Sequence, residues 1–233
     1  MKGGVIAIDG PSASGKSSTA RAVAEALGFA HLDSGALYRG VTLVALREAE
    51  RRGAEDPLSL DPEVMLRAAE DRGLMLHPDG SGFAAYLDGE PVNGAIRSAE
   101  VTRHVSAVSA IPVVREWVNA YLRELVRAGR DVVVDGRDIG TVVFPDADLK
   151  IFLTAAPETR AGRRLSQRGQ RAVHTDDLTR ETELLARRDH ADSTRDVAPL
   201  RRAPDALDLD TTAMSFDAAV SWILEQARGV FGP

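Results

Sequence analysis

A glycine-bounded loop near the N-terminus carries the residues best suited to bind phosphate. Gly10-Pro11-Ser12-Ala13-Ser14-Gly15-Lys16-Ser17 has a glycine, four further residues, a second glycine, a lysine and a serine. Glycines let the main chain approach phosphate oxygens closely, so that successive N–H groups point inward. We expect the run Gly10–Ser18 to bind the phosphates of ATP, with Lys16 on the β- and γ-phosphates and the Ser17 hydroxyl on Mg²⁺.

The elements around this loop fit a phosphate-binding site. The apolar run Val5–Ile8 predicts a buried parallel strand before the loop, and Lys16–Leu27 has helical spacing and ends at Gly28. A short strand then precedes Asp33-Ser34, which is a plausible N-cap for a helix that runs toward Arg52-Gly53. Alternating strands and helices of this kind predict right-handed crossovers and a parallel sheet.

A second carboxylate follows a later buried strand. Val132–Val134 is apolar and ends at Asp135, as expected for a residue that orients Mg²⁺ next to Ser17. Many aspartates at strand ends only cap a loop, and this alternative stays open for Asp135. The runs Leu149–Leu153 and Ala206–Leu209 also have the pattern of strands, and Ser215 is a plausible cap for a last helix.

Two segments depart from this alternation. Between Ala54 and Arg97, short apolar patches alternate with turn residues, which predicts a small antiparallel insert. Pro157–Thr194 is rich in charged residues and predicts a surface helical hairpin that could act as a mobile lid. The arginines of Arg160–Arg171 could equally line a solvated helix face.

Composition excludes several classes of function. The chain has 233 residues, a net charge of −6 and no cysteine, so thiolate metal sites and thiol nucleophiles are excluded. A negative net charge disfavours non-specific binding to nucleic acid or to an anionic membrane. With neither a membrane-spanning run nor a signal peptide in the sequence, we expect a cytoplasmic protein that binds no membrane.

Three further stretches resemble bacterial cytidylate kinases. They are Asp33-Ser34-Gly35-Ala36-Leu37-Tyr38-Arg39, the block that begins Asp135-Gly136-Arg137-Asp138-Ile139-Gly140-Thr141 and ends at Ala147, and Val197-Ala198-Pro199-Leu200. The similarity runs from Val5 to about Ala227. It implies an α/β fold with a P-loop NTPase core of about five parallel strands and helices on both faces. It also implies a small antiparallel insert on the monophosphate side and a helical lid.

This resemblance gives the expected division of the chain. The core would comprise residues 1–53, 98–156 and 195–233, the insert residues 54–97, and the lid residues 157–194. The activity implied is transfer of the γ-phosphate of ATP to CMP or dCMP, with Mg²⁺ bound to ATP. Kinases of this size tend to be monomers, and we expect a monomer here as well.

The resemblance also assigns the acceptor-site residues. Ser34, Tyr38 and Arg39 would line the monophosphate site; Ser106, Arg115 and Asp138 would contact cytosine; Arg137 and Arg195 would hold the acceptor phosphate; and Arg188 and Asp192 would lie against the sugar. We expect Lys16, Arg137, Arg188 and Arg195 to stabilise the charge of the transition state. Taken singly, Arg39, Arg115, Arg188 and Arg195 could each be a solvated arginine, and Arg137 and Asp138 could form a surface ion pair.

Base recognition has a physical basis in this assignment. An ionised Asp138 can accept hydrogen bonds from the cytosine N4 amino group, and Arg115 can donate to N3 or O2. Uracil has an acceptor at position 4, so we expect CMP to be strongly preferred over UMP. Alternatives are a P-loop kinase for UMP, thymidylate or a small hydroxyl acceptor such as shikimate or gluconate, and a nucleotide-binding module that transfers no phosphate.

Overall fold

The chain divides into two compact units, which are described separately. The computed structural model describes residues 3–80, 82–127, 129–170 and 174–232. The first unit comprises Met1–His31 and Gly129–Pro233, and the second comprises Leu32–Ala128. The second unit extends beyond the expected insert at residues 54–97 on both sides, because neighbouring helices pack with that segment.

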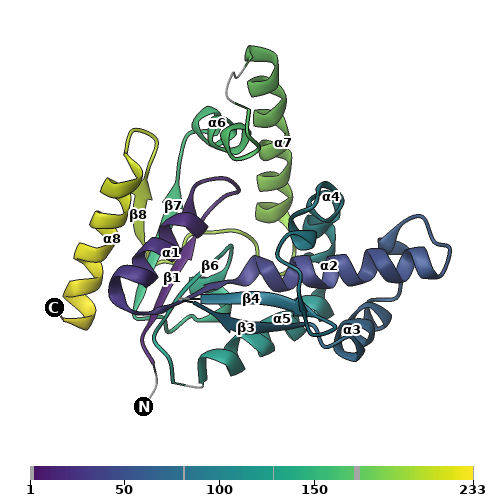
Figure 1. Ribbon diagram of the computed structural model, residues 1–233. Coiled ribbons are helices and arrows are strands. Elements are labelled where there is room, and N and C mark those ends of the chain that lie inside the picture. Colours follow the sequence, from purple (N-terminus) through teal and green to yellow (C-terminus); the bar gives the residue numbers. More distant parts are fainter. Residues whose placement is uncertain (1–2, 81, 128, 171–173, 233) are drawn as a thin grey trace. The chain divides into compact units, whose positions relative to one another are not determined.

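A parallel sheet forms the centre of the first unit (Figure 1). Its strands are β1 (Val5–Asp9), β6 (Val132–Gly136), β7 (Leu149–Thr154) and β8 (Leu207–Asp210), in the order β6-β1-β7-β8. β2 (Ala30–Asp33) begins in this unit beside β6. All residues of β1 and β6 are buried, which explains their unbroken apolar runs. The expected α/β fold with a largely parallel sheet flanked by helices is confirmed.

The register of β1 and β6 brings two functional segments together. Asp9 lies opposite Gly136, and Ile8 lies opposite Asp135. Both strands run in the same direction, so the loops that follow them leave the same edge of the sheet. The phosphate loop follows β1, and Arg137 and Asp138 follow β6.

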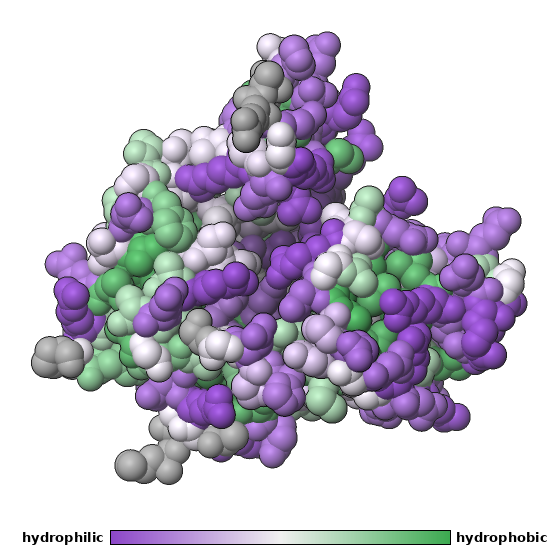
Figure 2. Space-filling view, viewed as in Figure 1, coloured by the Kyte–Doolittle hydropathy of each residue, from purple (hydrophilic) through white to green (hydrophobic). Residues whose placement is uncertain are grey.

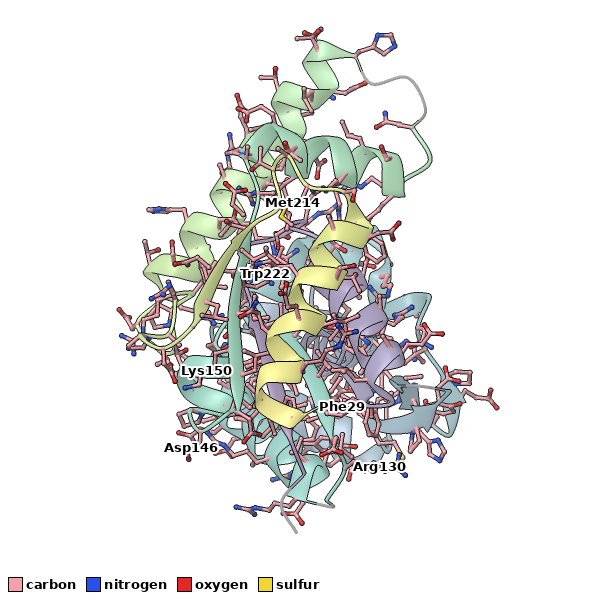
Figure 3. All side chains as sticks on the ribbon, turned by 90° about the vertical axis from the view of Figure 1, so that its left-hand side faces the viewer. Phe29, Arg130, Asp146, Lys150, Met214 and Trp222 are labelled. Atoms are coloured by element: carbon pink, nitrogen blue, oxygen red, sulfur yellow. The ribbon has the colours of Figure 1, made fainter. Side chains whose placement is uncertain are left out.

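Two helices pack against each other and against the apolar core of this sheet. They are α1 (Lys16–Leu27) and α8 (Phe216–Phe231), which is capped by Ser215 as expected. Three partly buried apolar residues pack on this core at successive levels along α8 (Figure 3). They are Met214 near the start of the helix, Trp222 in its middle and Phe29 near its end. The ring of Phe29 meets that of Phe231 edge-on, with 5.3 Å between ring centroids.

The expected helical hairpin is present in the first unit. It consists of α6 (Pro157–Gln167) and α7 (Thr175–Thr194), which pack on each other. Hydrophilic side chains gather over α7, at the top of Figure 2. Arg171, the last residue of the predicted arginine cluster, lies outside the described residues.

The second unit consists of helices packed on a small antiparallel sheet. α2 (Ser34–Arg51) begins where expected, and the side chain of its N-cap Asp33 accepts a hydrogen bond from Gly35 N. α4 (Ala99–Val108) and α5 (Pro112–Arg127) follow the sheet in the sequence. The short 3₁₀ helices η1 (Pro57–Ser59) and η2 (Ala95–Arg97) lie before and after the sheet.

The insert contains the expected antiparallel strands and one helix that the turn residues did not indicate. β3 (Met75–Asp79) pairs with β4 (Gly82–Leu87), which pairs with β5 (Glu90–Pro91). The additional helix is α3 (Pro62–Asp71), which contacts α2 and α5. Among the described residues, no helix is both long and apolar enough to cross a membrane.

Candidate functional site

The phosphate loop adopts a conformation that depends on its glycines. Gly10 has φ 155°, and a Cβ there would lie 2.0 Å from the carbonyl oxygen of Leu153, so no side chain fits. Gly15 has φ 99° and is the N-cap of α1. Ala13, between them, has φ 59° in the left-handed region, which is uncommon for a residue with a side chain. The loop therefore keeps a wound main chain at the start of a helix, as an anion site requires.

Lys16 belongs to the interior of this loop. Its side chain is 6% exposed, and Nζ donates a hydrogen bond to the carbonyl oxygen of Pro11 at 3.1 Å. The lysine is thus folded back over the loop it follows. An ammonium in this place can contact phosphate oxygens that the loop holds.

Ser17 and Asp135 lie together, and both are held by neighbours. The Ser17 hydroxyl donates to Oδ2 of Asp135 at 2.5 Å, and Nε2 of His31 lies 2.8 Å from Oδ1. A hydroxyl and a carboxylate are hard oxygen donors, which suit Mg²⁺ together with phosphate oxygens and water. The donor set therefore fits the magnesium expected from the sequence.

The charge state of Asp135 suits a metal-facing carboxylate. Burial alone would raise its pKa, but the hydrogen bond and charge of His31, the charge of Lys16 and the Ser17 hydroxyl together hold the pKa below its usual range. Asp135 is therefore ionised at neutral pH even though its side chain is buried.

A cluster of arginines and aspartates comes from the segment after β6, from the C-terminal part of α7 and from the residue that follows α7. Arg137 Nε donates to Oδ2 of Asp192 at 2.9 Å, and Arg195 Nη2 lies 3.5 Å from Oδ1 of Asp138. The positive charge of Arg188 also favours the ionised form of Asp192. Burial would raise the pKa of Asp192, but the charges of Arg137, Arg188 and Arg195 lower it below its usual range. These five predicted residues therefore meet in the first unit, and their charges balance in part.

The helical hairpin is tied directly to the phosphate loop. Asp189 on α7 accepts from Ser12 N at 2.9 Å, and Arg160 on α6 donates to the Ser12 carbonyl at 3.0 Å and also pairs with Asp189. Arg163 donates to the Ser14 carbonyl at 2.9 Å. Both helices of the hairpin therefore contact the main chain of the loop.

The remaining predicted residues lie in the second unit. Arg115 is 2% exposed, donates to the Ser109 carbonyl at 3.0 Å, and lies over the ring of Tyr38 at 5.5 Å from its centroid. Ser109 Oγ in turn donates to the Ser106 carbonyl at 3.0 Å. The structure thus joins Tyr38, Arg115 and Ser106 through direct contacts and the intervening Ser109.

Ser34 and Arg39 complete the group on α2. Ser34 is the buried first residue of the helix. Arg39 donates to the Ile96 carbonyl at 3.2 Å and to Thr102 Oγ1 at 3.1 Å. The guanidinium of Arg39 is thus oriented by residues of η2 and α4 rather than by solvent alone.

Several residues of these networks were not identified from the sequence. His31, Asp189 and Asn119 are examples; the Asn119 amide oxygen accepts from the Tyr38 hydroxyl at 3.4 Å. His31 stands just before Asp33-Ser34, but nothing in its spacing indicated a partner 104 residues away. Only the fold brings these side chains to their partners.

Comparison with known proteins places this sequence in a family. The cytidylate kinase family profile matches residues 6–229. A cytidylate kinase from Mycolicibacterium paratuberculosis is 47% identical over 226 residues, covering 96% of this chain and 95% of the relative. The cytidylate kinase of Streptomyces griseus is 43% identical over 226 residues, covering 97% of this chain and 93% of the relative.

A third relative extends the match to almost the whole sequence. A cytidylate kinase from Streptococcus equi subsp. zooepidemicus is 42% identical over 232 residues, covering 99% of this chain and 98% of the relative. The resemblance seen in the three sequence stretches is therefore confirmed over nearly the full length of the chain. The chain belongs to the cytidylate kinase family.

Proposed function

We propose that this protein transfers the γ-phosphate of ATP to CMP or dCMP, giving ADP and CDP or dCDP. Family membership over residues 6–229 supports the acceptor class. The observation that supports ATP as the phosphoryl donor is the phosphate loop. Lys16 is folded over this loop, in which Gly10 leaves no room for a side chain and Gly15 has a positive φ. This arrangement suits a triphosphate and needs no nucleophilic side chain.

Magnesium is proposed to bind with ATP at Ser17 and Asp135. These residues supply a hydroxyl and an ionised carboxylate 2.5 Å apart, which is a small protein donor set of the kind that Mg²⁺ completes with phosphate and water. When bound, the ion would neutralise charge on the β- and γ-phosphates. Ser17 and Asp135 would fix its position, and His31 would fix the carboxylate.

The arginine cluster of the first unit is proposed to bind the acceptor phosphate. In the transfer, an oxygen of the CMP phosphate attacks the γ-phosphorus while the bond from the γ-phosphorus to the bridging oxygen breaks. Arg137 and Arg195 would hold the attacking phosphate, because planar guanidinium groups can donate to two oxygens at once. Arg188 and Asp192 would contact the sugar. Together with Lys16, the three arginines would stabilise negative charge in the transition state.

Cytosine is proposed to be read by hydrogen bonds to its polar edge. Asp138 would accept from N4, and Arg115 would donate to N3 or O2. In support, Arg115 is buried and oriented by Ser109 and Tyr38, so its guanidinium has little freedom to reach solvent. Ser106 would contact the base as well. Ser34, Tyr38 and Arg39 would line the monophosphate site.

We also propose that the protein acts as a monomer in the cytoplasm. ATP and CMP or dCMP are its proposed small-molecule partners, and nucleic acid and membrane are proposed not to be.

An acceptor screen tests the function directly. ADP production from ATP would be followed with CMP, dCMP, UMP, dTMP, AMP, shikimate and gluconate in turn. We expect CMP and dCMP to support the fastest turnover, and Lys16→Ala to lose about 10²–10³-fold in rate. Arg228→Ala, which changes an exposed residue of α8, is the matched control and should keep full activity. Equal turnover of UMP and CMP, or an unchanged rate in Lys16→Ala, would contradict the proposal.

A further inference from the structure

Asp9 is a buried carboxylate whose main contacts are two main-chain amides far away in the sequence. It is 4% exposed and ends β1, directly before the phosphate loop. Its Oδ1 accepts from Ile139 N and its Oδ2 from Gly140 N, both at 2.8 Å. A carboxylate that accepts two amide protons at a helix start acts as an N-terminal cap.

The helix capped in this way is the short π-helix η3 (Ile139–Val143), and its own N-cap residue does not cap it. That residue is Asp138, whose side chain makes no capping hydrogen bond to η3. Aspartate is among the preferred N-cap residues, because its carboxylate can reach the amides that follow it. Here the amides of Ile139 and Gly140 donate to Asp9, and Oδ1 of Asp138 lies 3.5 Å from Arg195 Nη2.

The parallel register of β1 and β6 allows Asp9, rather than Asp138, to cap η3. Asp9 lies opposite Gly136, so its side chain is level with the start of the segment that leaves β6. The fit around it is tight, since a Cβ at Gly140 would lie 3.1 Å from Cδ of Lys150 and 3.5 Å from Oδ2 of Asp9. Lys150 is itself fixed by Asp205 at 2.7 Å. The first two amides of η3 therefore share Asp9 as their side-chain acceptor.

We propose that Asp9 determines base specificity by positioning Asp138. By capping η3 in place of Asp138, Asp9 keeps the Asp138 carboxylate turned away from its own helix and directed to the amino group of cytosine. Asp9 touches neither substrate in this scheme and acts only through Asp138. The inference rests on the proposed function, in which Asp138 reads N4 of CMP.

The test is the ratio of kcat/KM for CMP to that for UMP in full-length variants. Asp9→Asn keeps one acceptor oxygen but sets its amide group against the second N–H. Asp9→Ala removes the acceptor of both amides, so that the Gly140 amide is open to capping by Asp138. We expect the CMP-to-UMP ratio to fall about tenfold or more in both variants, while the KM for ATP changes less than about twofold. Asp138→Asn serves as the reference, because it removes the carboxylate proposed to discriminate CMP from UMP.

A matched control lies at the other end of the same strand. Asp148 Oδ2 accepts from Val5 N at 2.8 Å, so Asp148→Asn weakens a carboxylate–amide bond of β1 without touching η3. We expect this variant to keep the wild-type ratio. If Asp9→Asn does not fold, Asp9→Glu keeps the carboxylate but displaces it by one methylene, and its ratio should fall as well.

The outcomes separate the two proposals. If wild type shows no preference for CMP, the proposed base recognition fails. If wild type prefers CMP and Asp138→Asn loses this preference, but the Asp9 variants retain the wild-type ratio, only the role of Asp9 is overturned. A fall in the ratio that Asp148→Asn reproduces would also overturn it, because a general loss of strand order would then account for the effect.

Discussion

Nε2 of His31 lies 2.8 Å from Oδ1 of Asp135, and both side chains are buried, with 5% and 2% of their surface exposed. The other carboxylate oxygen accepts from Ser17. Both oxygens of Asp135 are therefore engaged within the protein, and the carboxylate has one defined orientation. Outer groups of this kind commonly tune the affinity of a site for its metal.

Replacing His31 should therefore weaken magnesium binding more than acceptor binding. In His31→Ala, Asp135 loses the neighbour that contributes most to keeping it ionised and oriented. We expect the Mg²⁺ concentration for half-maximal activity to rise about tenfold, with the KM for CMP nearly unchanged. Magnesium titrations at saturating ATP and CMP measure this.

The control for this prediction is an exposed histidine. His77→Ala removes an imidazole on β3 that lies at the surface of the second unit, and its magnesium dependence should match that of wild type. If His31→Ala also kept the wild-type magnesium dependence, the proposed orienting role of His31 would be wrong.

Much of the fold followed from local sequence signals. The apolar runs of β1 and β6, the glycines of the phosphate loop and the caps Asp33 and Ser215 act over a few residues, so they could be read directly. The same signal was present at α3, where Asp61 caps the helix and Pro62 follows, but the surrounding turn residues obscured it.

Other features could not be predicted because they depend on distant partners. η3 has only five residues, which is too short for a periodic pattern, and its cap Asp9 is 130 residues away from Ile139. Arg115 likewise lies over the ring of Tyr38, which the sequence alone does not place beside it. The roles of the acceptor-site residues remain predictions, although the structure brings several of them into contact.

Arg115→Lys should impair acceptor binding selectively. Arginine here donates to the Ser109 carbonyl and lies over Tyr38, and a lysine can reproduce neither the planar fork nor the stacking. We expect the KM for CMP to rise by about tenfold or more and the KM for ATP to stay close to wild type. Steady-state kinetics with each substrate varied in turn measure both constants.

Tyr38→Phe is the companion variant. It removes a hydroxyl that donates to Asn119 at 3.4 Å but keeps the ring beneath Arg115. We expect a much smaller rise in the KM for CMP than in Arg115→Lys. Equal effects in the two variants would mean that the hydroxyl, rather than the guanidinium, governs acceptor binding.

Asp9 should make stability depend on pH in a characteristic direction. Burial raises its pKa from 3.8 to about 6, although the amides of Gly140 and Ile139 and the charge of Lys16 oppose this, while Asp138 reinforces it. The folded state thus binds the proton more tightly than the unfolded state. The contribution of Asp9 to the free energy of unfolding is fully present below about pH 4 and falls by about 3 kcal/mol as pH rises through about 6.

Asp9→Asn isolates this contribution because the amide does not titrate. We expect the free energy of unfolding of wild type, minus that of the variant, to be on the order of 2–3 kcal/mol larger near pH 4 than near pH 7.5. Urea unfolding at several pH values measures the difference, and effects of lost hydrogen bonds that do not vary with pH cancel. A difference that stays constant over this range would contradict the raised pKa.

Arg160 and Asp189 should contribute jointly to ATP binding. Asp189 accepts from Ser12 N, Arg160 donates to the Ser12 carbonyl, and the two side chains pair with each other. Removing either one loosens the same residue of the phosphate loop. We therefore expect Arg160→Ala and Asp189→Asn each to weaken ATP binding, and the double variant to lose less than the sum, with a coupling of about 0.5–3 kcal/mol.

A second ion pair between the same helices distinguishes contact with the loop from general packing of the hairpin. Arg168 Nη1 donates to Glu181 Oε2 at 2.6 Å, joining the end of α6 to α7 without a described contact to the phosphate loop. Arg168→Ala and Glu181→Gln should change stability but leave the affinity for a non-hydrolysable ATP analogue unchanged. These two variants could instead weaken binding of the analogue as much as the Arg160 and Asp189 variants do. ATP binding would then depend on the order of the whole hairpin rather than on the hydrogen bonds to Ser12.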